Sequence, residues 1–362
     1  MDPITQGAVG ATASRLFAAH RFSALAVLIG VLSGMAADLD VLIQSPTDPL
    51  LFLEYHRHFT HALAFIPIGG WICALLMHLF IPRIRQAMRF RTTWLLTTLG
   101  YATHGLLDAC TTYGTQLFWP FSDVRIAWNI ISIIDPAFTL VIIALLWLSV
   151  KRDSRFWALM TVVYALAYLA LGYIQHQRAY EVGAQLAAQR GHEPVKLSMK
   201  PSFANLIVWK SVYAHEGEFY VDAVRVARDS RIYPGAVISV FDSKTDAPWL
   251  DQTSQQAHDI SRFDWFSNGY VGIDAQNPNR LTDVRFSIVP NEITGLWGIE
   301  LDKDALPSEH VAYYQHHGDG ASRVAGVRKL WAMLLGREIN EHSLNSEMPK
   351  REESLANQLI NN

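Results

Sequence analysis

Long apolar segments follow one another through the first half of the chain, separated by short polar connections. A helix needs roughly 20 predominantly apolar residues to cross a bilayer, and four of these segments come close to that length. With a shorter pair at the N-terminus, they predict about six membrane helices, at residues 1–20, 22–37, 59–81, 92–110, 127–150 and 156–174. Tryptophans lie near the ends of several segments, as interfacial aromatic residues do, at Trp94, Trp128, Trp147 and Trp157.

Basic residues predict the orientation of these helices. They gather in three connections, which contain Arg15 and Arg21, then Arg83, Arg85, Arg89 and Arg91, then Lys151, Arg152 and Arg155. Cytoplasmic loops carry an excess of Lys and Arg, so we expect these three connections to face the cytoplasm. With six helices, both ends of the membrane domain then face the other side.

The N-terminal segment also has features of a cleaved signal peptide. Arg15 and Arg21 precede the apolar run 22–37, which ends in Met-Ala-Ala before Asp38. We favour a retained helix, because the charged region begins far from the start and several more apolar segments follow.

From about Gln175 the chain changes character. A polar helix at residues 175–190 ends at Gly191-His192-Glu193-Pro194, and a further helix is expected at 251–266. Short β-rich runs occur at 206–213, 218–226, 236–241, 269–273, 284–289 and 295–301, and the first two form a hairpin around His215-Glu216-Gly217. The sequence therefore predicts a polytopic α-helical membrane domain at 1–176, a small α+β extramembrane domain at 177–335 and a flexible tail at 336–362.

Charge and cysteine content exclude two classes of function. The formal net charge of the 362 residues is -3, whereas a protein that binds nucleic acid needs a basic face for the phosphates. Cys73 and Cys110 belong to no Cys-x-x-Cys pair, so a disulfide framework or a structural zinc knuckle is not expected.

Acidic and imidazole side chains gather at the predicted outer ends of the helices. Asp38 and Asp40 follow the second apolar segment, and His56 and His61 precede the third. His104 and Asp108 are four residues apart, which places both on one face of a helix. Buried carboxylates and imidazoles are costly unless they are paired or metal-bound. These six residues therefore predict a metal site for one or two ions on the outer side of the membrane.

The donor types predict the metal and its chemistry. Mixed nitrogen and oxygen donors suit Zn, Mn or Fe. A metal in such a site supplies hydrolytic chemistry, because it lowers the pKa of bound water and polarises a phosphoryl or carbonyl group. We expect Arg57 to clamp an anionic substrate group, Asp40 or Asp108 to take a proton, and Thr111, Thr112 and Tyr113 to position the substrate.

Structural interpretations remain open for several of these residues. The His104 and Asp108 pair could be a hydrogen-bonded couple. Asp135 could orient a ligating histidine or anchor the helix that begins at Pro136. His58 either has no role in the site or supports a ligand from behind. We expect ordinary interior hydrogen bonds for His20 and His78. A metal-binding transporter and a structural envelope protein without turnover are the alternative functions.

These motifs together resemble the YdjM-like family of bacterial membrane-bound, metal-dependent hydrolases. The resemblance rests on Met1-Asp2-Pro3-Ile4-Thr5-Gln6-Gly7, Ala37-Asp38-Leu39-Asp40, His56-Arg57-His58-Phe59-Thr60-His61, His104-Gly105-Leu106-Leu107-Asp108, residues 111–121 and Asp135-Pro136. It covers residues 1–175 closely and 205–220 more loosely. Two positions depart from the pattern, since relatives often carry His at the position of Gln6 and a small residue at that of His58.

The resemblance implies a metal-dependent hydrolase of the bacterial inner membrane. It also suggests a distant likeness to the helical zinc phospholipase C and nuclease group, which favours a phosphoester or lipid-linked substrate. We therefore expect the site to act on an amphiphile at the outer face of the membrane, with the C-terminal domain in the periplasm.

Overall fold

The computed structural model describes residues 1–316 and 320–339 and divides into two compact units. The first unit contains Met1–Pro46, Leu51–Ile174 and Phe203–Asn205, and the second contains Thr47–Leu50, Gln175–Ser202 and Leu206–Asn362. The predicted tail at 336–362 lies almost entirely outside the described residues.

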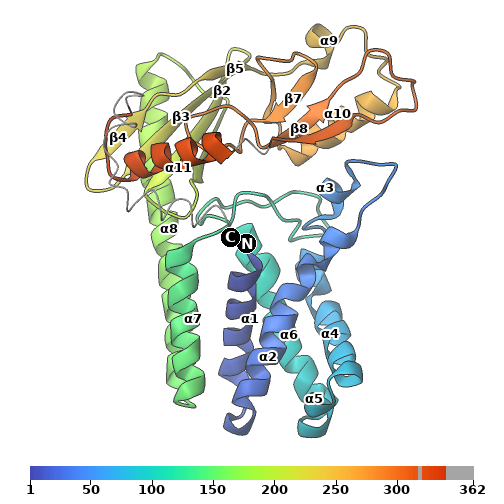
Figure 1. Ribbon diagram of the computed structural model, residues 1–362, viewed down its shortest axis with the longest axis vertical. Helices are drawn as coiled ribbons and strands as arrows, with labels where there is room; N and C mark the ends of the chain where they lie inside the picture. The colour runs from blue at the N-terminus through green and yellow to red at the C-terminus, as the bar shows by residue number, and fades with distance from the viewer. Residues whose placement is uncertain (317–319, 340–362) are drawn as a thin grey trace. The chain divides into compact units, whose positions relative to one another are not determined.

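Helices form the first unit, one within or overlapping each of the six predicted apolar segments (Figure 1). They are α1 (Pro3–Phe17), α2 (Ser23–Met35), α4 (Ile66–Phe80), α6 (Phe90–Ala109), α7 (Pro136–Lys151) and the first part of α8 (Arg155–Gln189). Short helices connect them, namely η1 (His20–Phe22), η2 (Ala36–Leu42), α3 (Leu51–Tyr55), η3 (Phe59–His61), η4 (Leu63–Phe65) and α5 (Pro82–Ala87). Three described stretches are long and apolar enough to span a membrane: His20–Leu42, Leu63–Phe80 and Arg155–Gln189.

One predicted helix boundary was wrong, and two predicted helices are continuous. Residues 127–135 are irregular, and α7 begins only at Pro136, where the Asp135 side chain accepts a hydrogen bond from the Phe138 amide (3.2 Å). Proline fixes a φ suited to the first helical turn, so the cap and Pro136 together set this start. The helices predicted at 156–174 and 175–190 form one continuous helix, α8, from Arg155 to Gln189, and the two units divide within it, after Ile174. Gly191, with a φ of 75°, lies just beyond its end, as predicted.

Glycines let α1, α2 and α6 pack with their backbones in contact. A Cβ at Gly34 would lie 2.7 Å from the Gln6 carbonyl oxygen, and one at Gly10 would lie 2.5 Å from the Gly30 carbonyl oxygen and 2.8 Å from the Gly34 Cα. Small residues permit this close approach between helices, as in many membrane helix pairs. A Cβ at Gly100 of α6 would likewise lie 2.3 Å from the Ser33 hydroxyl oxygen of α2, so α6, which carries His104 and Asp108, lies close to the helix that leads into η2 and Asp38.

Two of the connections rich in basic residues meet at the C-terminal end of α1. Arg15 is buried and pairs with Asp153 (3.0 Å), and Arg155 donates to the Ala18 carbonyl oxygen (2.8 Å). Two of the three connections predicted to face the cytoplasm therefore lie side by side.

Two antiparallel sheets form the second unit. The first has the order β1 (Lys196–Pro201), β2 (Val208–His215), β3 (Glu218–Val226) and β4 (Ser230–Tyr233), and β5 (Val237–Ser239) also pairs with β3. The second has the order β6 (Val271–Ile273), β7 (Arg280–Asp283), β8 (Trp297–Glu300) and β9 (Ala312–Gln315). Helices α9 (Ser243–Asp246), α10 (Gln255–Phe266) and α11 (Gly320–Leu334) complete the unit.

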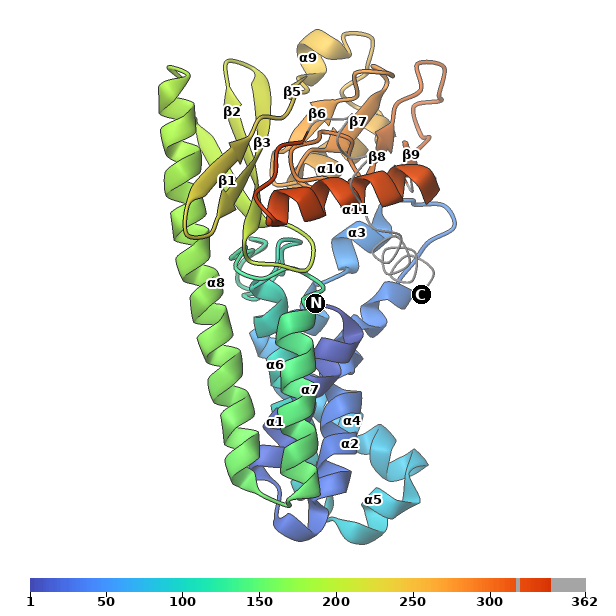
Figure 2. The same cartoon turned by 60° about the vertical axis from the view of Figure 1, so that its left-hand side comes forward.

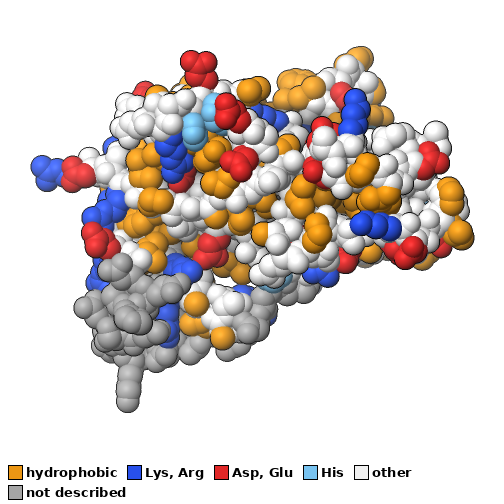
Figure 3. Space-filling view, turned by 90° about the horizontal axis from the view of Figure 1, so that it is seen from above, with side chains coloured by type: hydrophobic (Ala, Val, Ile, Leu, Met, Phe, Trp, Pro, Cys, Tyr) orange, Lys and Arg blue, Asp and Glu red, His pale blue; other side chains and the backbone are white. Residues whose placement is uncertain are grey.

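The first sheet is covered on both faces. Ala179 of α8 packs with Met199, Trp209 and Val224 on one face (Figure 2). On the other face, Val208 and Ala223 pack with Leu330 of α11. On the face of the molecule in Figure 3, hydrophobic side chains are interspersed with charged ones, as on ordinary water-exposed surfaces.

The predicted hairpin is confirmed, since His215 pairs with Glu218 across a two-residue turn. Glu216 and Gly217 both have positive φ, at 47° and 80°, which is the conformation that tight hairpins favour. The predicted strand at 284–289 was wrong, because the strand lies one segment earlier, at β7. We did not predict β1, although its apolar residues Leu197 and Met199 alternate with polar ones.

Candidate metal centre

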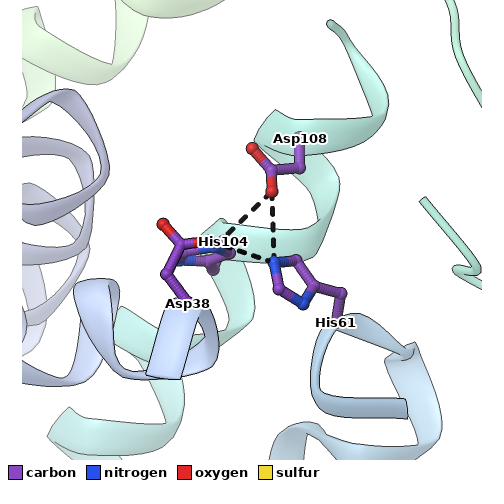
Figure 4. A group of neighbouring side chains, drawn as sticks. All are labelled: Asp38, His61, His104 and Asp108. Atoms are coloured by element: carbon purple, nitrogen blue, oxygen red, sulfur yellow. Dashed lines mark ion pairs between the residues drawn. The ribbon is translucent and has the colours of Figure 1, made fainter. Parts of the chain in front are cut away.

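Four side chains from separate parts of the first unit meet at one point. They are Asp38 from η2, His61 from η3, and His104 and Asp108 from α6 (Figure 4). Asp38 Oδ1 lies 3.2 Å from His104 Nε2 and 3.5 Å from His61 Nε2, and Asp108 Oδ2 lies 3.2 Å from His61 Nε2 and 3.5 Å from His104 Nε2. One atom from each residue lies within 4.8 Å of the other three, so a single ion could contact all four.

The second nitrogen of each ring fixes the tautomer. His104 Nδ1 lies 2.5 Å from the Gly34 carbonyl oxygen, and His61 Nδ1 lies 3.2 Å from Asp40 Oδ2. The Gly34 carbonyl can only accept, so His104 Nδ1 carries the hydrogen. The Thr60 hydroxyl lies 3.0 Å from His61 Nδ1 and donates to Asp40, so it can accept from His61 Nδ1 in the same way. In the neutral ring, each Nε2 then keeps a lone pair. His61 Nε2, His104 Nε2 and Asp108 Oδ2 are buried and have no hydrogen-bond partner within the described ranges. Two imidazole lone pairs and two carboxylate oxygens therefore face one another, as ligands do around a cation.

The Asp40 carboxylate accepts hydrogen bonds from several residues around this point. Its Oδ1 accepts from His56 Nδ1 (2.8 Å), and its Oδ2 accepts from the Arg57 amide (2.9 Å) and the Thr60 hydroxyl (2.9 Å) in addition to His61. A carboxylate bound in this way orients a ligating imidazole. Asp38, Asp40 and His56 also form a second group whose atoms are close enough for an ion. The sequence had indicated Asp40 and His56 as ligands, and the structure places them beside the four-residue group, with hydrogen bonds to each other.

Arg57 is buried, and its guanidinium contacts other residues of the site. Its Nε lies 3.2 Å from Asp108 Oδ2, and its Nη1 donates to Thr111 Oγ1 (2.8 Å). The guanidinium also lies 4.9 Å from the centre of the Tyr113 ring. Its φ of 63° is unusual for a residue other than glycine, and such strain is common at functional sites. Arg57 thus links Asp108 to the loop that the sequence indicated for substrate.

Gly105 brings η3 against α6. A Cβ at this position would overlap the carbonyl oxygen of His61. Only glycine therefore allows the His61 backbone to lie directly on the helix turn that carries His104. The sequence motif contained Gly105, but a role for it could not be derived from spacing alone.

Gln6 is a further residue of the site. Its Nε2 donates to Asp108 Oδ1 (2.9 Å), and the amino group of Met1 contacts the same oxygen. The sequence left a role for Gln6 in doubt, and the structure places it on the ligand Asp108 rather than at the meeting point of the four residues.

The other predicted residues lie around the site in different roles. Thr111 is buried and donates to the Asp108 carbonyl oxygen (2.7 Å), the neighbouring Thr112 is also buried, and the Tyr113 ring lies 5.3 Å from the His56 ring. His58 packs among aromatic rings, 5.6 Å from Trp119. Asp135 accepts from Tyr168 (2.9 Å) and caps α7, which is the helix-anchor role considered above.

Two histidines outside the site provide a contrast. His78 Nε2 lies 2.8 Å from Thr93 Oγ1, and His20 Nδ1 lies 3.0 Å from the Asp153 carbonyl oxygen. The prediction of an ordinary interior hydrogen bond is confirmed for His78, whereas His20 makes its hydrogen bond at an exposed position. In His61 and His104, by contrast, a buried Nε2 has no hydrogen-bond partner among the described residues and faces carboxylate oxygens.

Comparisons with known proteins agree with the motifs. The model of the YdjM inner membrane protein family matches residues 1–179. The uncharacterized protein YfhP of Bacillus subtilis (strain 168) is 31% identical over 112 residues, 31% of this chain and 33% of YfhP. The inner membrane protein YbcI of Escherichia coli (strain K12) is 32% identical over 108 residues, 29% of this chain and 60% of YbcI. The chain thus covers a third of one relative and 60% of the other. No solved structure matches.

All four converging residues, with Gln6, Asp40, Arg57 and Gly105 around them, lie within the matched region. The family description and the three candidate spans agree on an inner-membrane location. The resemblance seen in the motifs is confirmed, since residues 1–179 match the YdjM inner membrane protein family.

Proposed function

We propose that this protein is a membrane-bound metal-dependent hydrolase that acts on a phosphoester or lipid-linked amphiphile. The observation that carries the proposal is the pair of buried, unpaired Nε2 atoms that face Asp38 and Asp108. Two nitrogen and two oxygen donors suit Zn best, with Mn or Fe possible, and Asp40 and His56 could add a second ion beside the first. When bound, the metal would polarise the scissile group and activate water.

The surrounding residues would hold the site and the substrate. Asp40 fixes the His61 and His56 rings, so that each presents its Nε2. The buried Arg57 cation balances the negative charge of Asp108. It would also place positive charge next to the phosphoryl group of a bound substrate. Thr111 and Tyr113 hold the Arg57 guanidinium in place.

Exposed apolar side chains near the site support an amphiphilic substrate. Leu39, between Asp38 and Asp40, is 62% exposed, and Leu42, at the end of the same η2 turn, is 75% exposed. Such side chains would contact acyl or isoprenoid chains that arrive within the bilayer. We propose that all six helices of the first unit span the membrane, with the site and the C-terminal unit on the periplasmic side, as the basic connections favour.

Elemental analysis of the detergent-purified full chain is the first test. We expect stoichiometric Zn, Mn or Fe in the wild type, and its loss in His104→Ala and in Asp38→Ala. His78→Ala is the matched control, because it removes an interior histidine outside the site. A wild type that is metal-free and takes up neither Zn nor Mn would overturn the metal centre.

Turnover separates the hydrolase from the alternatives. We expect the metal-loaded wild type, but not His104→Ala, to hydrolyse a phospholipid or an isoprenoid phosphate. Bound metal without turnover on any such substrate would favour a structural or transport role, in which removal of the metal loosens the helices without loss of catalysis.

A further inference from the structure

A second group of buried charges lies in the C-terminal unit and contains only basic residues at its centre. Lys196 and Lys200 lie on one face of β1, and Lys210 on β2 is the direct cross-strand partner of Lys200. Like charges opposite each other destabilise a sheet. Arg285, from the segment after β7, adds a further buried cation to this face.

Two of these cations have partners. Arg285 binds both carboxylate oxygens of Asp283 (2.8 and 2.6 Å), and Lys210 donates to Ser287 Oγ (2.8 Å) and to the Glu292 carbonyl oxygen (2.7 Å). The Glu292 carboxylate pairs with Lys329 (2.8 Å). The Asp283 and Glu292 carboxylates are therefore already engaged, and Asp264 acts electrostatically on Lys196.

Lys200 differs from its neighbours. Its side chain is 5% exposed, and the described residues give its ammonium no hydrogen-bond partner, only the rings of Phe286 (4.8 Å) and Tyr270 (5.9 Å). Lys196 lies over the same Tyr270 ring (4.4 Å) and donates to the Asn268 carbonyl oxygen. Two amines thus share one aromatic ring with no carboxylate between them.

A bound anion would reduce the energetic cost of burying the Lys200 ammonium. An unpaired buried ammonium is costly. Burial lowers the pKa of Lys200 well below its usual value, with Arg285, Lys210 and Lys196 acting in the same direction and Asp283 opposing them. An anion among these cations would remove the conflict, because it supplies the missing acceptor.

We propose that Lys196, Lys200 and Arg285 form a binding site for a phosphate group, either as the free anion or as an anionic lipid headgroup. Lysines bind phosphate as point charges, and several cations around one position favour an anion with more than one negative charge. This site is separate from the candidate metal centre and does not depend on the proposed hydrolase activity.

Thermal unfolding of the full chain in detergent tests the proposal. Inorganic phosphate should raise the Tm of the wild type in a concentration-dependent manner, relative to chloride at equal ionic strength. Lys200→Met and Lys196→Met should weaken phosphate binding about tenfold or more, because each removes a charged contact. Lys244→Met, at an exposed position on α9, is the matched control and should bind like the wild type.

A second arm distinguishes the source of the phosphate. Detergent micelles doped with phosphatidylglycerol are compared with micelles doped with phosphatidylcholine. A Lys200-dependent rise in Tm with phosphatidylglycerol at concentrations where free phosphate has no effect assigns a lipid headgroup, and the reverse assigns free phosphate. Shifts of equal size in the wild type and both cluster variants, or no shift with either ligand, would overturn the site.

Discussion

Two buried charged groups, one in each unit, lack opposite kinds of hydrogen-bonding partner. In the first unit, His61, His104 and Asp108 present acceptor atoms without donors. In the second unit, Lys200 presents donors without an acceptor. Since a buried polar group is costly when unpaired, the sign of the missing partner predicts the sign of the ligand. The first group should bind a cation and the second an anion.

The strongest test of this contrast leaves every ligand in place. We expect Gly105→Ala to lose stoichiometric metal, because the added methyl group overlaps the His61 carbonyl oxygen and separates His61 from His104. Metal content and Tm are measured together. Gly320→Ala is the control, since nothing lies within 4 Å of a Cβ there. Normal metal content in Gly105→Ala would show that the close contact does not position the ligand.

A smaller effect is expected from Asp40→Asn. This change keeps the size of the side chain but replaces one acceptor oxygen, so His61 and His56 lose part of their orientation. Residues that orient a ligating histidine typically contribute about 10- to 100-fold in metal affinity. Competition with a chelator measures the change, with Asp153→Asn at the far end of α1 as the control. A complete loss of metal, equal to that in Asp38→Ala, would instead make Asp40 a direct ligand.

The smallest effect concerns the pH dependence of stability at the lysine cluster. Burial lowers the pKa of Lys210 from 10.5 to about 7. Between these values the unfolded chain holds a proton that the folded chain lacks, so the free energy of unfolding should rise with pH across this window. Lys210→Met should reduce that rise, as measured by Tm against pH in phosphate-free buffer. An unchanged slope would show that Lys210 stays charged in the folded protein.

The candidate metal centre could be predicted from the sequence where its geometry is local. His104 and Asp108, four residues apart on one helix, do lie together, with 3.5 Å between Nε2 and Oδ2. Residues 38–61 could be assigned to the same side because apolar segments fix where each connection lies. The different roles of Asp40 and Asp38 could not be predicted, since they depend on which oxygen meets which donor in a folded turn.

The C-terminal unit was less predictable because its elements depend on long-range pairing. The hairpin around Gly217 has a local signal, and it was found. Strand β1 was missed although Leu197 and Met199 alternate with polar residues, and the approach of Lys200 to Lys210 exists only in the folded sheet. For the same reason, the lysine cluster was not recognised before the register of β1 and β2 was known.

The glycines of α1 and α2 have a consequence for how related proteins with the same candidate centre can be recognised. Gly10, Gly30 and Gly34 set the spacing of the helices, and the Gly34 carbonyl oxygen also holds the His104 ring. A mutational scan scored by metal retention should therefore recover this glycine row alongside the histidines and aspartates. A search for distant relatives that weighs only the metal-binding side chains would overlook the positions where the absence of a side chain is the requirement.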